Sequence, residues 1–284
     1  MKGSSHLSII GDHKQLAPII TSEEAHKKGL GVSLFERLIE HSNVPSIMLD
    51  IQYRMHPELS DIPNTIFYNS QLVDGSRNPD GSLLESYSPP LTSFTKPSSA
   101  LSFINHEYTE SKEGESTFNE GECQVILSLI LDLLACNPQL KGNEIGIISP
   151  YIAQTIELLR LLNRDAEWSQ QFIQKLGQDR LKDLSEIEVK TVDGFEGREK
   201  SVIILSLTRS NEGGFIGFLD DPRRANVGLT RAKRCLLVVG NSQTLEKGVI
   251  TPNRISDLWS KLIKLCKSKK AFAEYSDISN KLLT

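Results

Sequence analysis

Four short segments of the sequence concentrate the side chains that could handle phosphate groups. They are residues 11–18, 52–57, 190–199 and 223–233. Their glycines allow sharp turns and a close approach of the backbone to a ligand, and their arginines present a planar fork that suits phosphate oxygens. The amide of Gln15 can accept a hydrogen bond from water and donate one to a phosphate oxygen. These residue types point to phosphate chemistry, although no segment is specific when it is taken alone.

Each segment also has a simpler interpretation. Arg54 stands between a predicted strand and a predicted helix, where arginines more often form surface ion pairs. His56 precedes a proline, a place typical of a packing or capping residue. In the last segment, Arg224 and Arg231 are seven residues apart, so a helix over residues 223–233 would place both on one side and aim two cations at a phosphate.

The third segment contains a turn with two glycines, Gly194 and Gly197, between two apolar strands. Thr191 could bond a phosphodiester, and Glu199 could accept from a ribose hydroxyl. Turns with two glycines are common, so this segment alone is weak evidence.

The elements that position these segments alternate between strands and helices, which is typical of a parallel sheet covered on both faces. Each segment is expected to follow a strand and to meet the others at the carboxyl edge of that sheet. A helix should begin at Asn119, a capping residue with Glu122 three positions later. Residues 69–99 read as an irregular excursion and residues 163–186 as a surface insertion. The expected strands are 7–10, 46–50, 101–104, 145–148, 187–192, 201–207 and 235–240, and the expected helices include 32–41, one opening at Pro57, one ending at Leu162, 223–233 and 255–268.

Composition narrows the class of protein. With 38% hydrophobic and 24% charged residues, the 284-residue chain is an ordinary globular sequence. Its net charge of −4 gives no basic field, so any contact with nucleic acid must come from a local patch. The lysines of residues 255–268 are interpreted as a solvated face.

The sequence also predicts a compartment. The four cysteines are widely spread, which indicates small buried side chains in a reducing compartment rather than a zinc site. No apolar run approaches the ~18 residues of a membrane span, and the N-terminus lacks the apolar stretch of a signal peptide. We expect a cytoplasmic or nuclear location and no membrane contact.

Together and in this order, the four segments resemble the nucleotide-facing motifs of superfamily 1B helicases, the group that contains the up-frameshift and senataxin-like RNA helicases. Gly-Asp-x-x-Gln-Leu-x-Pro is similar to motif III, and Gln-Tyr-Arg-Met-His-Pro to motif IV. Val-Asp-Gly-Phe-Glu-Gly-Arg-Glu is similar to motif V, and Asn-Val-Gly-Leu-Thr-Arg-Ala to motif VI. Residues 148–154 resemble a further motif that touches the nucleic-acid backbone. The resemblance runs from about residue 7 to about residue 268, interrupted near 163–186.

The resemblance implies a role for each matching residue. Gln15 would sense the γ-phosphate of ATP, and Arg54 and Arg231 would neutralise the charge that builds on it during hydrolysis. The implied partner is single-stranded nucleic acid, RNA rather than DNA, held through its backbone with little base specificity. The other implied contacts are Tyr53, stacking on adenine, with Glu199, Gly197 and Arg224 for the rest of ATP, and Pro18, Ser149, Tyr151 and Thr191 for the nucleic acid.

Two departures from the family pattern matter. Members usually have glutamine where this chain has Glu196, whose carboxylate cannot donate a hydrogen bond and repels phosphate. No Gly-x-x-x-x-Gly-Lys-Ser/Thr occurs, so the phosphate-cradling loop is missing, as is the acidic strand end that would hold Mg²⁺.

The expected fold is therefore α/β, a RecA-like parallel sheet of the P-loop NTPase type that lacks the P-loop. Residues 1–45 would be the tail of a first RecA-like domain, and residues 46–284 the second one. Mg²⁺ and most phosphate contacts are expected only with the missing first domain, and the isolated chain is expected to have negligible ATPase activity.

Two alternatives remain open. The chain could be a non-catalytic nucleic-acid-binding or regulatory protein derived from a helicase, or an incomplete gene product of a full helicase. The presence of Gln15, Arg54 and Arg231 favours the second alternative, because a lobe that serves only as a scaffold would not need them.

Overall fold

Six parallel strands form the central sheet of the computed structural model, which describes residues 6–41, 44–93 and 99–276. Every neighbouring pair of strands runs in parallel. The order across the sheet is β12 (Phe272–Glu274), β3 (Leu101–Asn105), β9 (Ala232–Gly240), β8 (Lys200–Ser206), β6 (Ile145–Ser149) and β7 (Glu188–Thr191). The predicted α/β, RecA-like class is confirmed, with β12 as an added strand that the sequence pattern did not predict.

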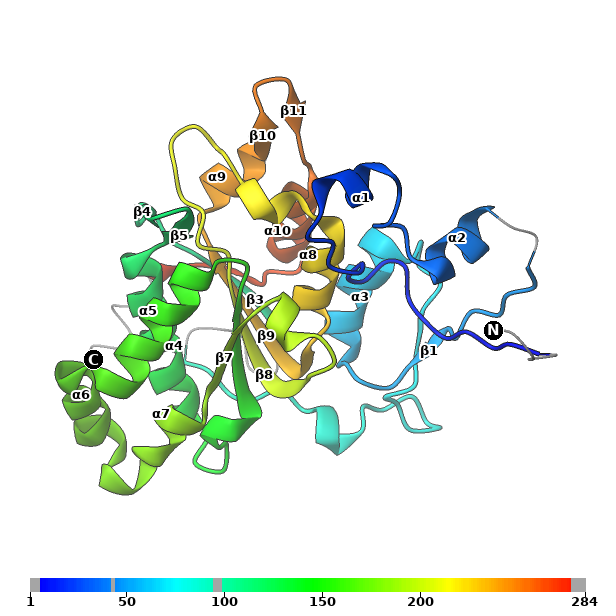
Figure 1. Ribbon diagram of the computed structural model, residues 1–284. Helices are drawn as coiled ribbons and strands as arrows, with labels where there is room; N and C mark the ends of the chain where they lie inside the picture. The colour runs from blue at the N-terminus through cyan, green and yellow to red at the C-terminus, as the bar shows by residue number, and fades with distance from the viewer. Residues whose placement is uncertain (1–5, 42–43, 94–98, 277–284) are drawn as a thin grey trace.

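Helices cover both faces of this sheet (Figure 1). Residues along each strand alternate between the two faces; on β8, Val202 and Ile204 join one buried cluster, while Ile203 and Leu205 join the other. Burial on both faces explains why these strands read as continuous apolar runs. One face is covered by α4 (Glu120–Cys136), α5 (Ile152–Arg164), α6 (Ala166–Leu176) and α7 (Lys182–Glu186), and the other by α3 (Pro57–Phe67), α8 (Pro222–Leu229), α9 (Ser242–Lys247) and α10 (Leu258–Ser268).

Local signals account for two helix starts. The Asn119 side chain accepts from the backbone N–H of Glu122 and caps α4, as predicted. α3 begins at Pro57, where a missing N–H costs nothing. The His56 ring accepts from the N–H of Glu58, so His56 is a capping residue and its burial lowers its pKa.

The prediction of a surface insertion at residues 163–186 is wrong. Trp168 and Phe172 of α6 are buried in the core against α4, and Leu176 packs beside them. These apolar residues are spaced by four, which places them on one face of a helix that is otherwise polar. Arg180 in η3 (Gln178–Arg180) donates to the carbonyl oxygen of Leu140 and fastens the segment to the body.

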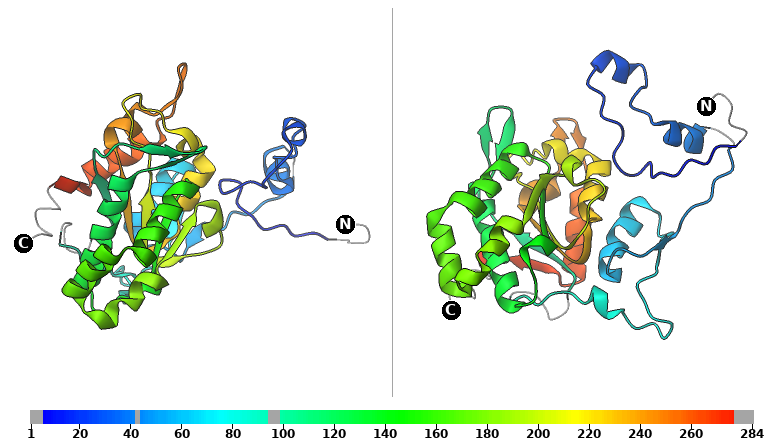
Figure 2. Two further views of the ribbon diagram at one scale, coloured as in Figure 1. Left: turned by 60° about the vertical axis from the view of Figure 1, so that its left-hand side comes forward. Right: turned by 60° about the horizontal axis from the view of Figure 1, so that its bottom comes forward.

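The predicted strands at residues 7–10 and 46–50 are also wrong. Both stretches lie within the described residues and form no strand there. Ile10 and Ile47 are 88% and 91% exposed. A strand needs a neighbour for its backbone hydrogen bonds, and here only β1 (Ile51–Gln52) finds one, β2 (Val73–Asp74). α1 (Glu23–Lys27) and α2 (Leu34–His41) stand outside the sheet layers, on the side of α3 and α8 (Figure 2).

The other described elements are short. The region predicted to be irregular, 69–99, holds only β2 and η1 (Glu85–Tyr87) among its described residues. Cys123, Cys235 and Cys266 are buried, as predicted, whereas Cys136 is half-buried, and all four cysteines are free. Within the described residues, no helix has both the length and the apolar content that crossing a membrane requires.

The remaining elements are two hairpins, β4 (Ser111–Glu113) with β5 (Ser116–Phe118) and β10 (Val249–Thr251) with β11 (Arg254–Ile255), and the short helices η2 (Gly142–Glu144), η4 (Asp193–Phe195) and η5 (Gly217–Asp220).

Candidate functional site

The four phosphate-type segments do not share one edge of the sheet, so that prediction is wrong. Ser149 and Thr191 end β6 and β7, whereas Glu199 and Arg231 immediately precede β8 and β9. The cause is the connection from β7 to β8: both strands are parallel to β6, so residues 192–199 must cross a face of the sheet. Phe195 is buried in this crossing.

Gly146 on β6 makes room for that crossing, because a Cβ there would lie 2.7 Å from Cζ of Phe195. α8 runs back across the same face of the sheet, from the loop after β8 to the start of β9. It ends at Leu229, so the prediction that Arg224 and Arg231 share one side of a helix over 223–233 is wrong. Arg231 lies in the link between α8 and β9.

Two guanidinium groups converge at the C-terminal end of α8. Nη1 of Arg54 donates to the Thr230 carbonyl oxygen at 3.2 Å, and Nη2 of Arg231 donates to Thr230 Oγ1 at 2.8 Å. Glu199 bridges the outer side of this cluster, because its carboxylate binds Nε of Arg54 at 2.6 Å and Nζ of Lys233 at 2.8 Å. The hydrogen bonds from Lys233 and Arg54 lower the pKa of Glu199. Arg54, Arg231 and Glu199 are therefore brought together as the sequence predicted.

Arg231 is a buried cation whose hydrogen-bond partners within the described residues are all neutral. Only 2% of it is exposed, and its remaining hydrogen bonds reach the Val227 carbonyl oxygen at 3.1 Å and Gln15 Oε1 at 3.3 Å. Among the described residues, no carboxylate forms an ion pair with it. Burial lowers the pKa of Arg231 to about 10, and repulsion by Arg54 adds to this. A buried charge without a counter-charge is costly, so an anion would be stabilised here.

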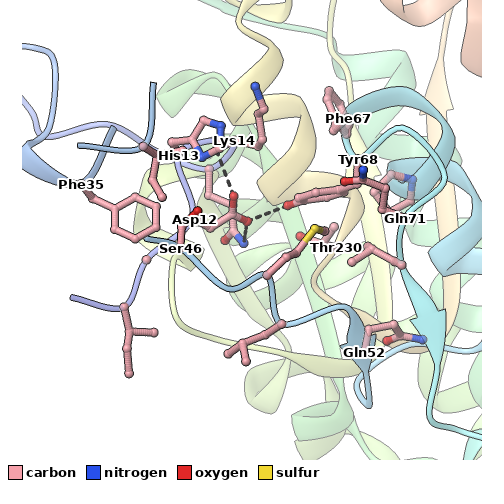
Figure 3. Close-up of a pocket in the computed structure, with 18 of the residues that line it drawn as sticks. Asp12, His13, Lys14, Phe35, Ser46, Gln52, Phe67, Tyr68, Gln71 and Thr230 are labelled. Atoms are coloured by element: carbon pink, nitrogen blue, oxygen red, sulfur yellow. Dashed lines mark hydrogen bonds between the residues drawn. The ribbon is translucent and has the colours of Figure 1, made fainter. Parts of the chain in front are cut away.

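The loop that carries Gln15 is held by a second set of polar contacts (Figure 3). Asp12 Oδ2 accepts from Gln15 Nε2 at 2.7 Å and from the Tyr68 hydroxyl at 2.6 Å. Asn226 on α8 donates to the Lys14 carbonyl oxygen at 2.9 Å and to the Tyr68 oxygen at 2.8 Å. Burial, together with the bond to Asp12, raises the pKa of Tyr68.

Tyr68 and Asn226 were not identified as site residues from the sequence. Tyr68 is the C-cap residue of α3, one position before the stretch predicted to be irregular, and carries no local signal. Asn226 stands inside the fourth segment, and its buried Oδ1 has no hydrogen-bond partner among the described residues. An unpaired buried acceptor is unusual in a folded protein and is normally satisfied by a water molecule or another polar group.

A cavity of about 850 Å³ opens beside the arginine cluster. Gln15, Tyr53, Arg54 and Thr230 supply its polar and aromatic wall. Tyr53 is 65% exposed, and its ring lies over Gly75, where a Cβ would come within 2.3 Å of it. A cavity of this size and lining can accept a nucleotide. The other side of the cavity is apolar, with Ile9, Ile10, Phe35, Ile39, Ile47, Met48 and Leu49.

Arg224, one of the predicted ATP contacts, lies apart from this cluster. Its guanidinium forms two 3.2 Å hydrogen bonds to the carboxylate of Asp193 and a 3.5 Å ion pair with Asp221. Arg224 does not line the cavity but lies beside Val192 at the far end of α8. Arg224 is separated from Arg54 and Arg231 because it lies near the start of α8, whereas Arg231 follows the end of that helix. Gly197 adopts φ +73°, a left-handed conformation that favours glycine, in the turn leading to Glu199.

The predicted nucleic-acid contacts are only partly accessible. Ser149 is fully buried, with its hydroxyl 3.0 Å from Thr208 Oγ1, and Tyr151 is 3% exposed. Thr191 is half-buried and accepts from the N–H of Gly194 at 3.2 Å. Pro18 is exposed, but on the N-terminal segment rather than at this edge. Neither the Ser149 nor the Tyr151 hydroxyl faces solvent, so this edge needs another residue to contact a strand.

The chain matches one protein family and several known proteins. The family described as an AAA domain matches residues 30–243. The chain is 36% identical over 276 residues to the regulator of nonsense transcripts 1 homolog of Drosophila melanogaster, covering 96% of this chain and 21% of that protein. It is 37% identical over 254 residues to the ATP-dependent helicase NAM7 of Saccharomyces cerevisiae, covering 88% and 24%.

A third relative is the probable helicase MAGATAMA 3 of Arabidopsis thaliana. It is 34% identical over 287 residues, which cover 97% of this chain and 32% of the relative. The chain thus spans between about a fifth and a third of the length of these relatives.

Proposed function

The chain belongs to the AAA domain family and to the up-frameshift group of superfamily 1B helicases, and we propose that it supplies the arginine half of a composite ATP site. In this proposal ATP lies between two RecA-like domains, and closure of the cleft around ATP moves the protein along single-stranded nucleic acid. RNA is the proposed strand, since relatives bear the name of regulators of nonsense transcripts.

The observation that carries the proposal is the buried Arg231 guanidinium, which lies beside Arg54 and Gln15 and has no carboxylate partner in the part of the chain that the structure describes. Phosphoryl transfer needs cations placed where negative charge develops, and an arginine in such a place contributes roughly 10³–10⁵ in rate. Tyr53 lines the cavity and is exposed, and it is proposed to stack on the adenine. Glu199 is held by Arg54 and Lys233, and it is proposed to accept from the ribose.

We also propose that residues 1–45 belong to a first RecA-like domain and residues 46–284 to the second. Apolar side chains in and beside the N-terminal segment support this division, because Ile10, Ile19, Ile47 and Leu49 are 79% to 91% exposed. Side chains of this kind are normally covered by a core. The phosphate loop and the Mg²⁺ ligands would come from the first domain, so the isolated chain would turn over ATP at background rate.

A chimera tests the proposal. The chain is joined to the preceding part of the yeast helicase NAM7, in place of the segment that it matches, and RNA-stimulated ATP turnover is measured. We expect turnover by the chimera, none by the chain alone, and a loss of roughly 10³-fold or more in Arg54→Ala and Arg231→Ala. Arg160→Ala is the matched control, because Arg160 is an exposed arginine on α5 whose ion pair, among the residues that the structure covers, is with Glu157 of the same helix.

Three outcomes would overturn the proposal. One is steady ATP turnover by the isolated chain, and another is full turnover by the two cleft variants in an active chimera. The third is an inactive chimera whose parts are folded and bind RNA, which would favour the non-catalytic binding protein.

A further inference from the structure

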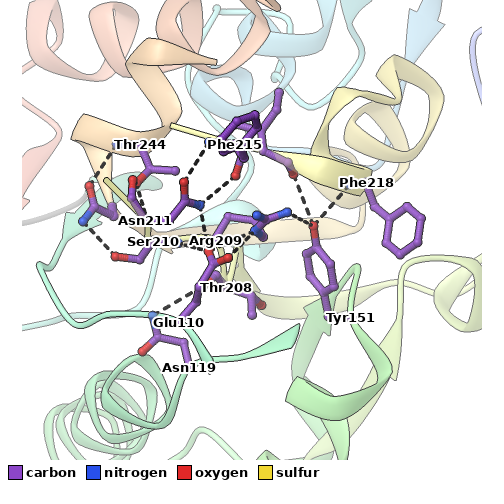
Figure 4. A network of polar contacts seen from close by, with 12 residues as sticks. Glu110, Asn119, Tyr151, Thr208, Arg209, Ser210, Asn211, Phe215, Phe218 and Thr244 are labelled. Atoms are coloured by element: carbon purple, nitrogen blue, oxygen red, sulfur yellow. Dashed lines mark hydrogen bonds and ion pairs between the residues drawn. The ribbon is translucent and has the colours of Figure 1, made fainter. Parts of the chain in front are cut away.

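The loop after β8, residues 207–221, is held in one conformation by two carboxylates. Fully buried Glu122 accepts from the backbone N–H of Thr208 at 2.9 and 3.1 Å. Glu110 accepts from Arg209 Nε at 2.9 Å and from the N–H of Ser210 at 2.6 Å (Figure 4). Thr208 has φ +65°, which is strained for a β-branched residue. The charge-assisted hydrogen bonds around it keep that conformation in place, so the loop is rigid where it leaves the sheet.

Tyr151 fixes the next part of the loop. Its hydroxyl donates to the Ile216 carbonyl oxygen at 3.2 Å and accepts from Arg209 Nη1 at 3.3 Å and from the Phe218 N–H at 3.2 Å. These three bonds use the full capacity of a phenol oxygen. Gly217 allows the close approach, with φ +54° and no room for a Cβ, which would lie 2.7 Å from the Tyr151 oxygen.

These contacts hold the aromatic ring of Phe218 at the surface of the protein. The Phe218 ring lies 5.5 Å from the Tyr151 ring, centroid to centroid, yet 57% of Phe218 is exposed. It borders the same hollow as Pro150, Val192 and Arg224. Pro150 and Val192 immediately follow the ends of β6 and β7, so the ring stands at the carboxyl edge of the sheet. In Figure 4 the Phe218 side chain points away from the polar network and outward.

We propose that Phe218 is a stacking platform for one base of the single strand, and that Tyr151 and Arg209 are positioning residues that aim it. This proposal rests on the proposed function, which supplies the strand. An aromatic ring beside backbone contacts is the arrangement that binds single strands without sequence preference. Stacking of a base on Phe218 costs little conformational entropy, because the loop and Tyr151 already orient the ring. Tyr151 thereby contributes to strand binding without touching a phosphate.

Fluorescence anisotropy of the 284-residue chain with a fluorescein-labelled oligouridylate at low salt tests the proposal. Phe218→Ala should weaken binding at least about fivefold, which is the lower end for loss of one stacked base. Phe218→Trp should retain binding, and Phe218→Leu, which keeps apolar area without a π-face, should lose most of what alanine loses. Val73→Ala is the matched control, since Val73 is 55% exposed but lies on the separate β1–β2 sheet.

Tyr151→Phe separates positioning from direct contact. If the hydroxyl acts by aiming Phe218, its removal weakens binding in the wild-type background and has no effect in the Phe218→Ala background. An unchanged affinity of Phe218→Ala overturns the stacking proposal while the proposed function stands. A Tyr151→Phe effect that persists in the Phe218→Ala background overturns the positioning role. Absence of any wild-type binding overturns both the strand-binding part of the proposed function and this inference.

Discussion

Arg231 and Gln15 meet at a single contact, in which Arg231 Nη2 donates to Gln15 Oε1 at 3.3 Å. The two residues come from the predicted motifs VI and III, 216 positions apart. The bond is long and its acceptor is neutral, whereas the guanidinium is buried and has Arg54 as a neighbour. A phosphate oxygen would satisfy Arg231 better than the Gln15 amide does.

Gln15→Glu should therefore block anion binding at this cluster. A carboxylate at position 15 would neutralise Arg231 and repel phosphate, while Gln15→Ala would leave the cation free for it. We expect pyrophosphate to raise the thermal midpoint of the wild type and of Gln15→Ala by a few degrees. Gln15→Glu should show no such rise. A rise in Gln15→Glu equal to that of the wild type would contradict the assignment of Arg231 as the anion-binding group.

Glu110 gives the stability a defined pH dependence. Burial alone would raise the pKa of Glu110, but hydrogen bonds from Arg209, Asn211 and Ser210 outweigh it and hold the pKa below its usual value of 4.5. A lowered folded-state pKa stabilises the protein above that usual value, and the stabilisation is lost as the pH falls through the folded-state pKa. Glu110→Gln should reduce the free energy of unfolding by about 2 kcal/mol at neutral pH, with the difference shrinking in acid.

Urea unfolding of Glu110→Gln and of the wild type, followed across the acidic range, measures this difference. Glu113→Gln is the control, because Glu113 lies exposed on the β4–β5 hairpin. A Glu110→Gln deficit that is the same at neutral and acidic pH would show that the carboxylate charge is not the source of the stability.

Phe172 tests whether residues 163–186 belong to the core. Its side chain is fully buried with Trp168 against α4. Phe172→Ala should lower the free energy of unfolding by about 3–5 kcal/mol, which is the cost of deleting a buried aromatic side chain. Gln174→Ala, at an exposed position on the same helix, should change it by less than about 0.5 kcal/mol. Equal stability of the two variants in chemical unfolding would restore the description of this segment as an insertion.

The parts of the fold that sequence could predict are those with strong local signals. The Asn119 cap, the Pro57 start and the apolar strand over residues 201–207 appear where they were expected. The predicted helix over 223–233 is too long. Its residue types favour a helix, but Ala232 pairs with Lys200 and the chain continues as β9. Tertiary pairing overrides local preference in such places.

The candidate site shows the same division between local and distant information. Gln15, Arg54, Arg231 and Glu199 were found through short segments, and the structure brings them together. Tyr68 was missed because its partner, Asp12, is 56 positions away and no local pattern marks it. The burial of Tyr151 could not be read from its segment either, since Phe218 and Ile216 surround it from a distant loop.

α8 connects the arginine cluster to the opposite edge of the sheet. Its eight residues span about 12 Å, with Arg224 and its neighbour Phe218 at one end and Arg231 at the other. Ala225, Val227 and Leu229 are buried in the same hydrophobic cluster. In the proposed motor, a displacement of α8 toward a phosphate bound at Arg231 would also shift Arg224 at the other end of the helix, and would thereby couple the cleft to the hollow beside Phe218.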